Sequence, residues 1–260
     1  MMKLFAKILF LVAFALIPEV AHALNFKPLL ANTFEPRVGT IYECAGRKLR
    51  LDIGTSLDVK TFDLQDSKLS IGVDFFTYTR LRSEGEFKFP VETADYYFGV
   101  NGAYVSDPWS IRLRVAHISS HIVDGLADSV TLKREPFVYS REFVDLVGAY
   151  RWKNLRFYAG ATLLFSMLPK DFLAVQPQVG LDYRYPLTSA IDVVAGYDLR
   201  FAGMNTNYYP VHSMQAGLNF KTSGDVGIFL GAYGFHGKSI HGMFYNEVDD
   251  YLGVGFQVMF

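Results

Sequence analysis

Alternation of apolar and polar residues along most of the chain is the sequence feature that most restricts its fold. Large apolar side chains occupy every second position of many short segments, such as 155–165 and 191–201, with glycine, polar or charged residues between them. Because successive side chains of a β-strand point to opposite faces, each segment is predicted to be a strand with one apolar and one polar face. Twelve strands are expected, over 38–44, 49–57, 69–76, 95–104, 109–121, 137–150, 155–165, 175–185, 191–201, 213–221, 226–233 and 251–260.

The strands are predicted to close into an all-β structure, an antiparallel transmembrane β-barrel over residues 38–260. Three features favour a barrel over a secreted β-sandwich. The segments run about ten residues, as a tilted strand needs to cross a bilayer. Aromatic residues cap the apolar faces, as in the girdles at membrane interfaces. The chain also ends on Phe260 within an alternating strand. A closed barrel would leave no free sheet edge.

The first 23 residues are predicted to be a cleaved signal peptide. Lys3 and Lys7 precede a short apolar run over 8–17, and Ala21-His22-Ala23 follows, which matches the basic start, apolar core and small-residue cleavage site of secretory signals. Residues 24–37 contain two prolines and are expected to be an irregular periplasmic lead-in. No later segment approaches about 18 consecutive apolar residues, so no transmembrane helix is expected.

Composition argues against several kinds of site. The formal net charge of −1 gives no basis for a nucleic-acid partner. Cys44 is the single cysteine, so an internal disulfide or a cysteine-based zinc cluster is excluded. The 23 Phe, 16 Tyr and 22 Gly favour β-structure, with glycines where strands bend or pack closely.

Connection lengths are expected to alternate between short and long, as between the periplasmic turns and outer loops of a barrel. The first two connections break this order, because 45–48 is short and 59–67 is longer. Short turns are predicted at 106–109, 151–154, 185–188 and 222–225, and longer connections near 81–93, 122–136, 166–174, 202–210 and 236–249.

The inward positions of the predicted strands carry charges of both signs. Twelve strands enclose a modest interior, so these long side chains are predicted to fill it as an ion-pair network. Arg141 and Asp145 form one further expected pair. The alternative is an interior kept polar for solvation. The inward charged residues are Arg50, Asp52, Asp58, Asp74, Arg112, Arg114, Arg156, Asp182, Arg184, Asp192, Asp198 and Arg200.

His117 and Ser119 are the candidate catalytic pair. They continue the parity of the apolar residues in 109–121, so in a barrel both side chains face lipid near the outer end of the strand. Lipid offers no hydrogen-bond partner, and a polar pair there is costly unless it is used. A serine beside a histidine is the nucleophile and base of acyl transfer.

Glu142 is the candidate third member of this site. If residue 117 pairs with residue 142, Glu142 would lie beside His117 and orient its ring. Asp124 and Asp128, in the following outer loop, could bind a divalent cation such as calcium that stabilises an oxyanion; no other cofactor is expected. The alternative is a polar rim above the bilayer, formed by His117, Ser119 and their neighbours.

The remaining histidines give only a weak metal signal. His236 and His241 lie in the last long connection and are interpreted as exposed turn residues, and His212 as an interfacial residue.

Several stretches resemble the bacterial domain-of-unknown-function family 1207, namely 26–37, 112–121, 139–142 and 236–245. The likeness spans nearly the whole mature chain and implies an envelope protein without assigning an activity. That family usually continues Ser-Ser-His with Leu-Gly-Asp-Glu, whereas this chain has Ile122-Val123-Asp124-Gly125 and so lacks the second acid.

The sequence His117-Ile118-Ser119 is also similar to the H-x-S strand motif of the outer-membrane phospholipase A family and of the lipid A deacylases. That resemblance implies a twelve-stranded barrel with catalysis at its lipid-facing surface. Those enzymes follow the serine with Asn, where this chain has Ser120, and Glu142 would have to take over the orienting role.

The sequence therefore predicts an integral outer-membrane barrel that hydrolyses acyl esters of phospholipid or lipopolysaccharide. Ser119 would be the nucleophile, His117 the base and Glu142 the orienting residue. Membrane lipid is the expected partner, a homodimer is compatible with the pattern, and nucleic acid is not expected. The alternative is a non-enzymatic barrel, either structural or a narrow solute channel, whose long loops bind a partner.

Overall fold

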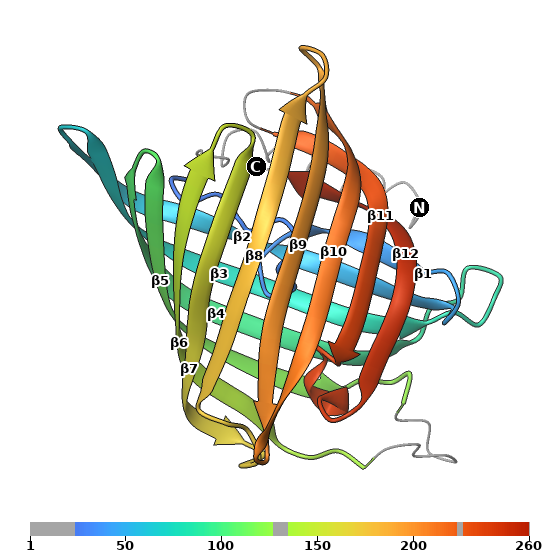
Figure 1. Ribbon diagram of the computed structural model, residues 1–260. Helices are drawn as coiled ribbons and strands as arrows, with labels where there is room; N and C mark the ends of the chain where they lie inside the picture. The colour runs from blue at the N-terminus through green and yellow to red at the C-terminus, as the bar shows by residue number, and fades with distance from the viewer. Residues whose placement is uncertain (1–23, 127–134, 223–225, 260) are drawn as a thin grey trace, which may run out of the picture.

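The described part of the chain forms a closed antiparallel β-barrel (Figure 1). The structure is a computed structural model that describes residues 24–126, 135–222 and 226–259. Within these residues the twelve predicted strands are confirmed, and each pairs with its neighbours in chain order. The strands are β1 (Val38–Glu43), β2 (Lys48–Leu64), β3 (Ser67–Arg82), β4 (Val91–Ser106), β5 (Trp109–Ile122), β6 (Tyr139–Trp152), β7 (Leu155–Leu168), β8 (Val175–Pro186), β9 (Ile191–Met204), β10 (Asn207–Lys221), β11 (Gly227–Lys238) and β12 (Val248–Met259).

The barrel closes between its first and last strands, where Val38 lies opposite Val258. The end of the barrel at this pair is called the turn end, because it carries short connections such as 107–108 and 153–154. The opposite end, called the loop end, carries the connections 83–90, 123–138 and 239–247.

Two predicted connection lengths are wrong, because the strands pair further than their alternation suggests. Strands β2 and β3 meet at a tight turn over 65–66, where a longer connection over 59–67 was expected. Strands β9 and β10 likewise meet at 205–206, where a loop over 202–210 was expected, and Asn207 pairs with Met204.

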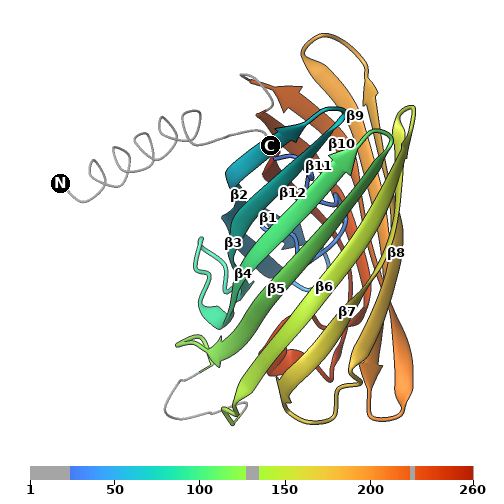
Figure 2. The same cartoon turned by 90° about the vertical axis from the view of Figure 1, so that its left-hand side faces the viewer.

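Side-chain alternation divides the barrel into an apolar exterior and a polar interior. On β5, Ile111 and Leu113 are exposed on the outside, whereas Arg112 and Arg114, which alternate with them, are buried in the lumen. Figure 2 shows the strong tilt of the strands, which closing a twelve-stranded sheet requires. Strands β5, β6 and β7 are hydrogen-bonded neighbours and lie side by side over most of their length.

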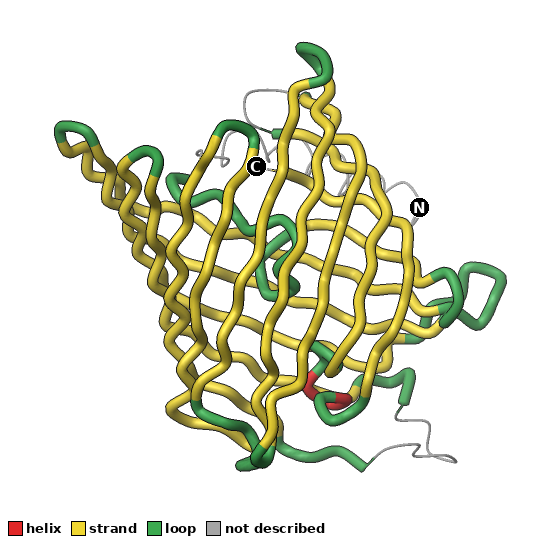
Figure 3. The backbone as a smooth tube through the Cα atoms, viewed as in Figure 1, coloured by secondary structure: helices red, strands yellow, loops and turns green. Residues whose placement is uncertain are grey.

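Residues 24–37 run inside the lumen, and we call them the N-terminal segment. Figure 3 shows this segment as a loop within the ring of strands. Leu29 is 1% exposed, and Phe26 packs in the same cluster as Val147 and Tyr158 of the wall. At Gly196 a Cβ would lie 2.8 Å from the Cβ of Leu30, so glycine lets the segment approach β9 closely. The expectation of an irregular periplasmic lead-in gives no indication that these residues fill the lumen.

The predicted interior ion pairs are present, and the N-terminal segment contributes a central acid. Glu35 accepts hydrogen bonds from Arg112 Nη2 at 2.6 Å and Arg114 Nη2 at 2.9 Å. Arg114 Nε also lies 3.1 Å from Asp74 Oδ2. Other interior pairs join Arg50 with Asp52, Arg156 with Asp182, and Arg184 with Asp192.

The expected pair of Arg141 with Asp145 is wrong. Asp145 instead accepts a hydrogen bond from Thr162 Oγ1 at 2.8 Å and lies 3.9 Å from Arg112 Nη2. Arg141 lies against aromatic rings, among them those of Tyr139 and Phe172.

The connection 239–247 folds into the lumen at the loop end and includes the 3₁₀-helix η1 (Gly242–Phe244). His241 Nδ1 lies 2.9 Å from Asp95 Oδ2, and the backbone N–H of Gly242 donates to Asp95 Oδ1 at 2.8 Å. The backbone N–H of Met243 donates to Ser120 Oγ at 3.2 Å. The prediction that His241 is an exposed turn residue is therefore wrong, since its loop turns inward and buries it.

No helix in the three described stretches is long and apolar enough to cross a membrane. The predicted signal peptide over 1–23, the candidate ligand Asp128 and the terminal Phe260 all lie outside the described residues.

Candidate functional site

Five polar residues gather on the exterior of β5, β6 and β7, where most exposed side chains are apolar. We call them the exterior polar cluster. Their parity places them outside, since His117 and Ser119 alternate with the buried Ala116, Ile118 and Ser120. The cluster comprises His117, Ser119, Ser140, Glu142 and Ser166.

His117 and Glu142 lie directly opposite each other on β5 and β6, the register expected for this hairpin. His117 Nδ1 is 2.8 Å from Glu142 Oε1, and the Ser140 hydroxyl donates to the same oxygen at 2.7 Å. The two ionisable side chains are 41% and 30% exposed. A carboxylate hydrogen-bonded to Nδ1 fixes the orientation of the imidazole ring and favours the tautomer in which Nε2 can accept a proton.

A β-bulge brings Ser166 into the cluster. The pairing of β6 with β7 shifts between Glu142 and Phe143, so that Glu142 faces Ser166 and Phe143 faces Leu164, with Phe165 as the extra residue. A bulge inserts one residue and turns the following side chains to the other face. Ser166 therefore points outward, and its hydroxyl interacts with the Glu142 carboxylate.

Ser119 lies between Tyr96 on β4 and Ser140 on β6 in the strand register. It is two positions from His117 on the same face of β5, within the span of neighbouring side chains on one strand. Among the described residues its hydroxyl makes no side-chain hydrogen bond, so it is not committed to a structural partner.

Apolar side chains border the cluster along the strands. Val115 is exposed on the turn-end side, and Phe98 is exposed on β4 directly opposite His117. Toward the loop end, Val138 and Leu168 are exposed beyond Ser140 and Ser166. On β5 the polar character continues to His121, whose ring lies 5.8 Å from that of Tyr96. On β6 and β7 the exterior polar cluster is therefore flanked by exposed apolar side chains.

Sequence comparison assigns the chain to a family. Residues 69–260 match the family described as "Protein of unknown function (DUF1207)". The chain belongs to this family. This member of DUF1207 matches no curated protein. The predicted family resemblance is thereby confirmed.

Solved structures show the fold that this DUF1207 protein shares. Outer membrane phospholipase A from Escherichia coli aligns at a TM-score of 0.55 with 12% identity, over 88% of this chain and 94% of that chain. The Salmonella typhi outer membrane phospholipase, solved as a dimer with bound calcium, aligns at a TM-score of 0.55 with 12% identity, over 90% of this chain and 93% of that chain. This chain is thus similar to outer-membrane β-barrels in fold.

Of the two predicted metal ligands, Asp124 and Asp128, the structure describes only Asp124. Asp124 is exposed in the turn directly after β5, and Asp128 falls outside the described residues. The described stretches contain no group of three His, Cys, Asp or Glu that could hold a metal ion. One exposed carboxylate does not make a calcium site, so calcium at Asp124 and Asp128 stays a prediction.

A second polar row runs across the exterior of β9 to β12. His212 Nδ1 lies 2.7 Å from Tyr197 Oη, and His236 Nδ1 lies 3.5 Å from Asp250 Oδ2. His236 thus resembles His117 in having an acidic neighbour on the next strand. The residue two positions further on is Lys238, so this row offers no nucleophile at the equivalent place.

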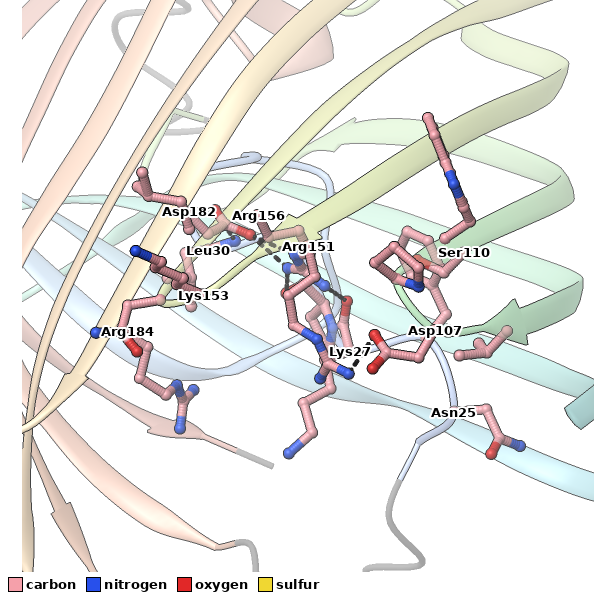
Figure 4. Close-up of a pocket in the computed structure, with 17 residues that line it drawn as sticks. Asn25, Lys27, Leu30, Asp107, Ser110, Arg151, Lys153, Arg156, Asp182 and Arg184 are labelled. Carbon is pink, nitrogen blue, oxygen red and sulfur yellow. Dashed lines mark hydrogen bonds and ion pairs between the residues drawn. The ribbon is translucent and has the colours of Figure 1, made fainter. Parts of the chain in front are cut away.

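A cavity of about 330 Å³ opens at the turn end between the N-terminal segment and the short turns (Figure 4). Arg156 pairs with Asp182 and donates to the backbone carbonyls of Lys27 and Pro28, each at 2.7 Å. Arg151 pairs with Asp107 at 2.5 Å across the rim. The main cations of this cavity therefore hold the N-terminal segment and the turns in place.

Sequence reasoning missed two members of the exterior polar cluster. Ser140 has the parity of Glu142, so its outward position could have been read from the alternation. Ser166 could not, because strict alternation from Phe165 places residue 166 inside, and only the bulge turns it outward.

Proposed function

We propose that this DUF1207 protein is an integral barrel of the bacterial outer membrane that hydrolyses acyl esters of phospholipid or lipopolysaccharide at its exterior surface. The single observation that supports this most is the 2.8 Å contact between His117 Nδ1 and Glu142 Oε1 on the outside of the barrel. In lipid, an ionisable pair is costly to maintain and is rarely present without a use.

The proposed reaction uses three side chains. Ser119 Oγ attacks the acyl carbonyl carbon while its proton passes to His117 Nε2, and Glu142 stabilises the imidazolium that forms. The ester C–O bond then breaks, and the alcohol leaves with the proton from His117. Water attacks the acyl-serine in the same way, which releases the fatty acid and restores Ser119 and His117.

The surrounding residues support this assignment of roles. Ser140 donates to Glu142, so its hydroxyl is occupied, whereas the Ser119 hydroxyl has no such partner among the described residues. The exposed apolar side chains of Phe98, Val138 and Leu168 border the cluster. An acyl chain lying along the barrel wall would contact these side chains and bring its ester to the level of Ser119.

Release of fatty acid from defined lipids tests the proposal. The purified full-length barrel is mixed with micelles of phospholipid or of lipopolysaccharide, and free fatty acid is measured by mass spectrometry. Ser119→Ala and His117→Ala should each lower the rate by at least about 100-fold, the usual range for loss of a nucleophile or base.

His236→Ala is the matched control, because it removes an exterior histidine with an acidic neighbour but no serine two positions on. It should leave the rate unchanged. Equal fatty-acid release by the wild type and Ser119→Ala, on both lipid classes, would refute the hydrolase.

The rival proposal is a non-enzymatic structural barrel or narrow solute channel. The interior is largely occupied by the N-terminal segment and the connection 239–247, which favours a closed barrel over an open pore. Absence of hydrolysis together with steady single-channel currents in planar bilayers would favour the channel.

Cross-linking of single cysteines on the exterior of β5 would report whether two copies associate as a homodimer.

A further inference from the structure

Arg141 is a buried cation without an acidic partner among the described residues. Its side chain extends from β6 into the lumen, and the residue is 8% exposed. Its guanidinium carbon lies 5.7 Å from the ring centre of Phe34, 5.2 Å from that of Tyr139 and 5.1 Å from that of Phe172. Aromatic faces attract a guanidinium group but accept no in-plane hydrogen bond. Its Nε atom is buried and has no hydrogen-bond partner.

Two small cavities adjoin this guanidinium group, and we call them together the lumen chamber. Their volumes are about 20 and 30 Å³, and both are lined by Phe34, Arg141, Gln176 and Arg200. Gln176 on β8 is 3% exposed, and its Nε2 atom also lacks a hydrogen-bond partner. Two deeply buried donors from different strands therefore border the same space without an acceptor.

Four carboxylates in and around the chamber have hydrogen-bond donors other than Arg141, and one of their oxygens, Asp171 Oδ1, is buried without a partner. Asp198, which lines one of the two cavities, accepts a hydrogen bond from Tyr158 Oη at 2.8 Å. Asp171 accepts one from Tyr245 Oη at 2.9 Å, and Asp95 is bound to His241 and Gly242. Asp145, which lines the other cavity, accepts a hydrogen bond from Thr162 Oγ1 and lies 3.9 Å from Arg112 Nη2. None of these acids hydrogen-bonds Arg141.

A second guanidinium group reinforces the positive charge. The guanidinium carbon of Arg200 lies 4.6 Å from the ring centre of Phe34, so Arg141 and Arg200 contact the same ring. Arg200 Nη2 donates to Gln178 Oε1 at 2.8 Å and makes only a long contact of 3.4 Å to Asn32 Oδ1. Arg141 and Arg200 therefore place two guanidinium cations beside the chamber.

We propose that the lumen chamber binds a monatomic anion, with chloride as the physiological ligand. Arg141 and Gln176 donate to the ion, and Arg200 adds a second positive charge beside it. The two cavities, of about 20 and 30 Å³, leave room for a halide ion beside these donors. The ion supplies the counter-charge that a buried guanidinium group requires.

Bromide diffraction and chloride-dependent stability test this site. Crystals of the full barrel grown with bromide should show an anomalous peak between Arg141 and Gln176. In detergent at constant ionic strength, replacing gluconate by chloride should raise the Tm of the wild type by about 2–4 °C, with saturation. Arg141→Gln should abolish this difference, and Gln176→Leu should reduce it.

Arg151→Gln is the control, since it removes an exposed guanidinium group at the turn end and should leave the chloride effect intact. The heat-dependent gel mobility of the barrel verifies folding of each variant. The proposal is overturned if bromide gives no peak in the chamber, which would mean that water alone fills it, or if chloride stabilises the wild type and Arg141→Gln equally. If Arg141→Gln does not fold, the anomalous bromide map and the chloride effect on the Tm of Gln176→Leu decide whether the site exists.

Discussion

Glu35 and Arg112 form a two-point ion pair, with Glu35 Oε1 2.6 Å from Arg112 Nη2 and Glu35 Oε2 3.0 Å from Arg112 Nη1. Arg114 binds the same carboxylate at 3.1 and 2.9 Å. One acid of the N-terminal segment therefore bridges two cations of the barrel wall. Since all three side chains are buried, losing the acid removes the hydrogen-bonded partner of Arg112 and leaves Arg114 with Asp74 alone among the described residues.

Glu35→Gln is expected to destabilise the barrel by about 3–5 kcal/mol, the range for removing one partner of a buried ion pair. Equilibrium unfolding in denaturant, followed by the gel mobility of the folded form, measures the change. Glu84→Gln is the comparison, because the Glu84 side chain is 46% exposed in its pair with Arg82. This substitution should lower the free energy of unfolding by less than about 1 kcal/mol. Similar losses for the two variants would contradict the central role of Glu35.

The contribution of Glu35 should depend on pH in a defined direction. Burial acts to raise the pKa of Glu35, but the charges and hydrogen bonds of Arg112 and Arg114 outweigh it and lower the pKa from 4.5 to about 2. A group with a lowered pKa in the folded state contributes its full stability above its unfolded pKa, and loses it as pH falls through the folded value. The stability gap between wild type and Glu35→Gln should be constant above about pH 5 and shrink between pH 4.5 and 2.

Contacts of the N-terminal segment should also keep the lumen closed to ions. Asn32 Nδ2 donates to Gln178 Oε1 at 3.1 Å, which anchors the segment to β8. In planar bilayers the wild type should conduct little, whereas the double variant Glu35→Ala, Asn32→Ala should show frequent open events. A double variant as silent as the wild type would mean that the segment does not block the lumen.

The strand pairing of the site follows from the sequence, whereas the filling of the lumen does not. Alternation fixes the parity of His117 and Glu142, and a hairpin between their strands leaves few registers that bring two polar residues opposite each other. The N-terminal segment has no such period, and Glu35 meets Arg112 across 77 positions of the chain. Alternation gives the wrong orientation for Ser166 for a local reason, because one bulged residue reverses the parity of the strand at this point.

The connection 239–247 should detach from the lumen when its anchor on β4 is removed. Asp95 is fully buried and accepts from His241 and from the backbone of Gly242. Asp95→Ala is expected to raise amide hydrogen exchange in 239–247 by at least about tenfold, because two hydrogen bonds to a buried carboxylate are lost. Exchange in the connection 153–154 at the turn end serves as the internal reference and should stay the same. Unchanged exchange in 239–247 would show that apolar packing of η1 alone holds it.

Glu142→Gln separates an orienting role from a structural one. The amide can still accept a hydrogen bond from His117 Nδ1 but carries no charge to stabilise the imidazolium formed in the reaction. The kcat of fatty-acid release should fall by about 100-fold or more, with little change in KM. The free energy of unfolding should change by less than about 1 kcal/mol, because the His117–Glu142 pair is partly exposed. Ser166→Ala, which removes one neighbour of the carboxylate and keeps its charge, should cost only a few-fold. If Glu142→Gln keeps full kcat while Ser119→Ala abolishes it, Glu142 has no part in the reaction, and His117 is oriented by the strand register alone.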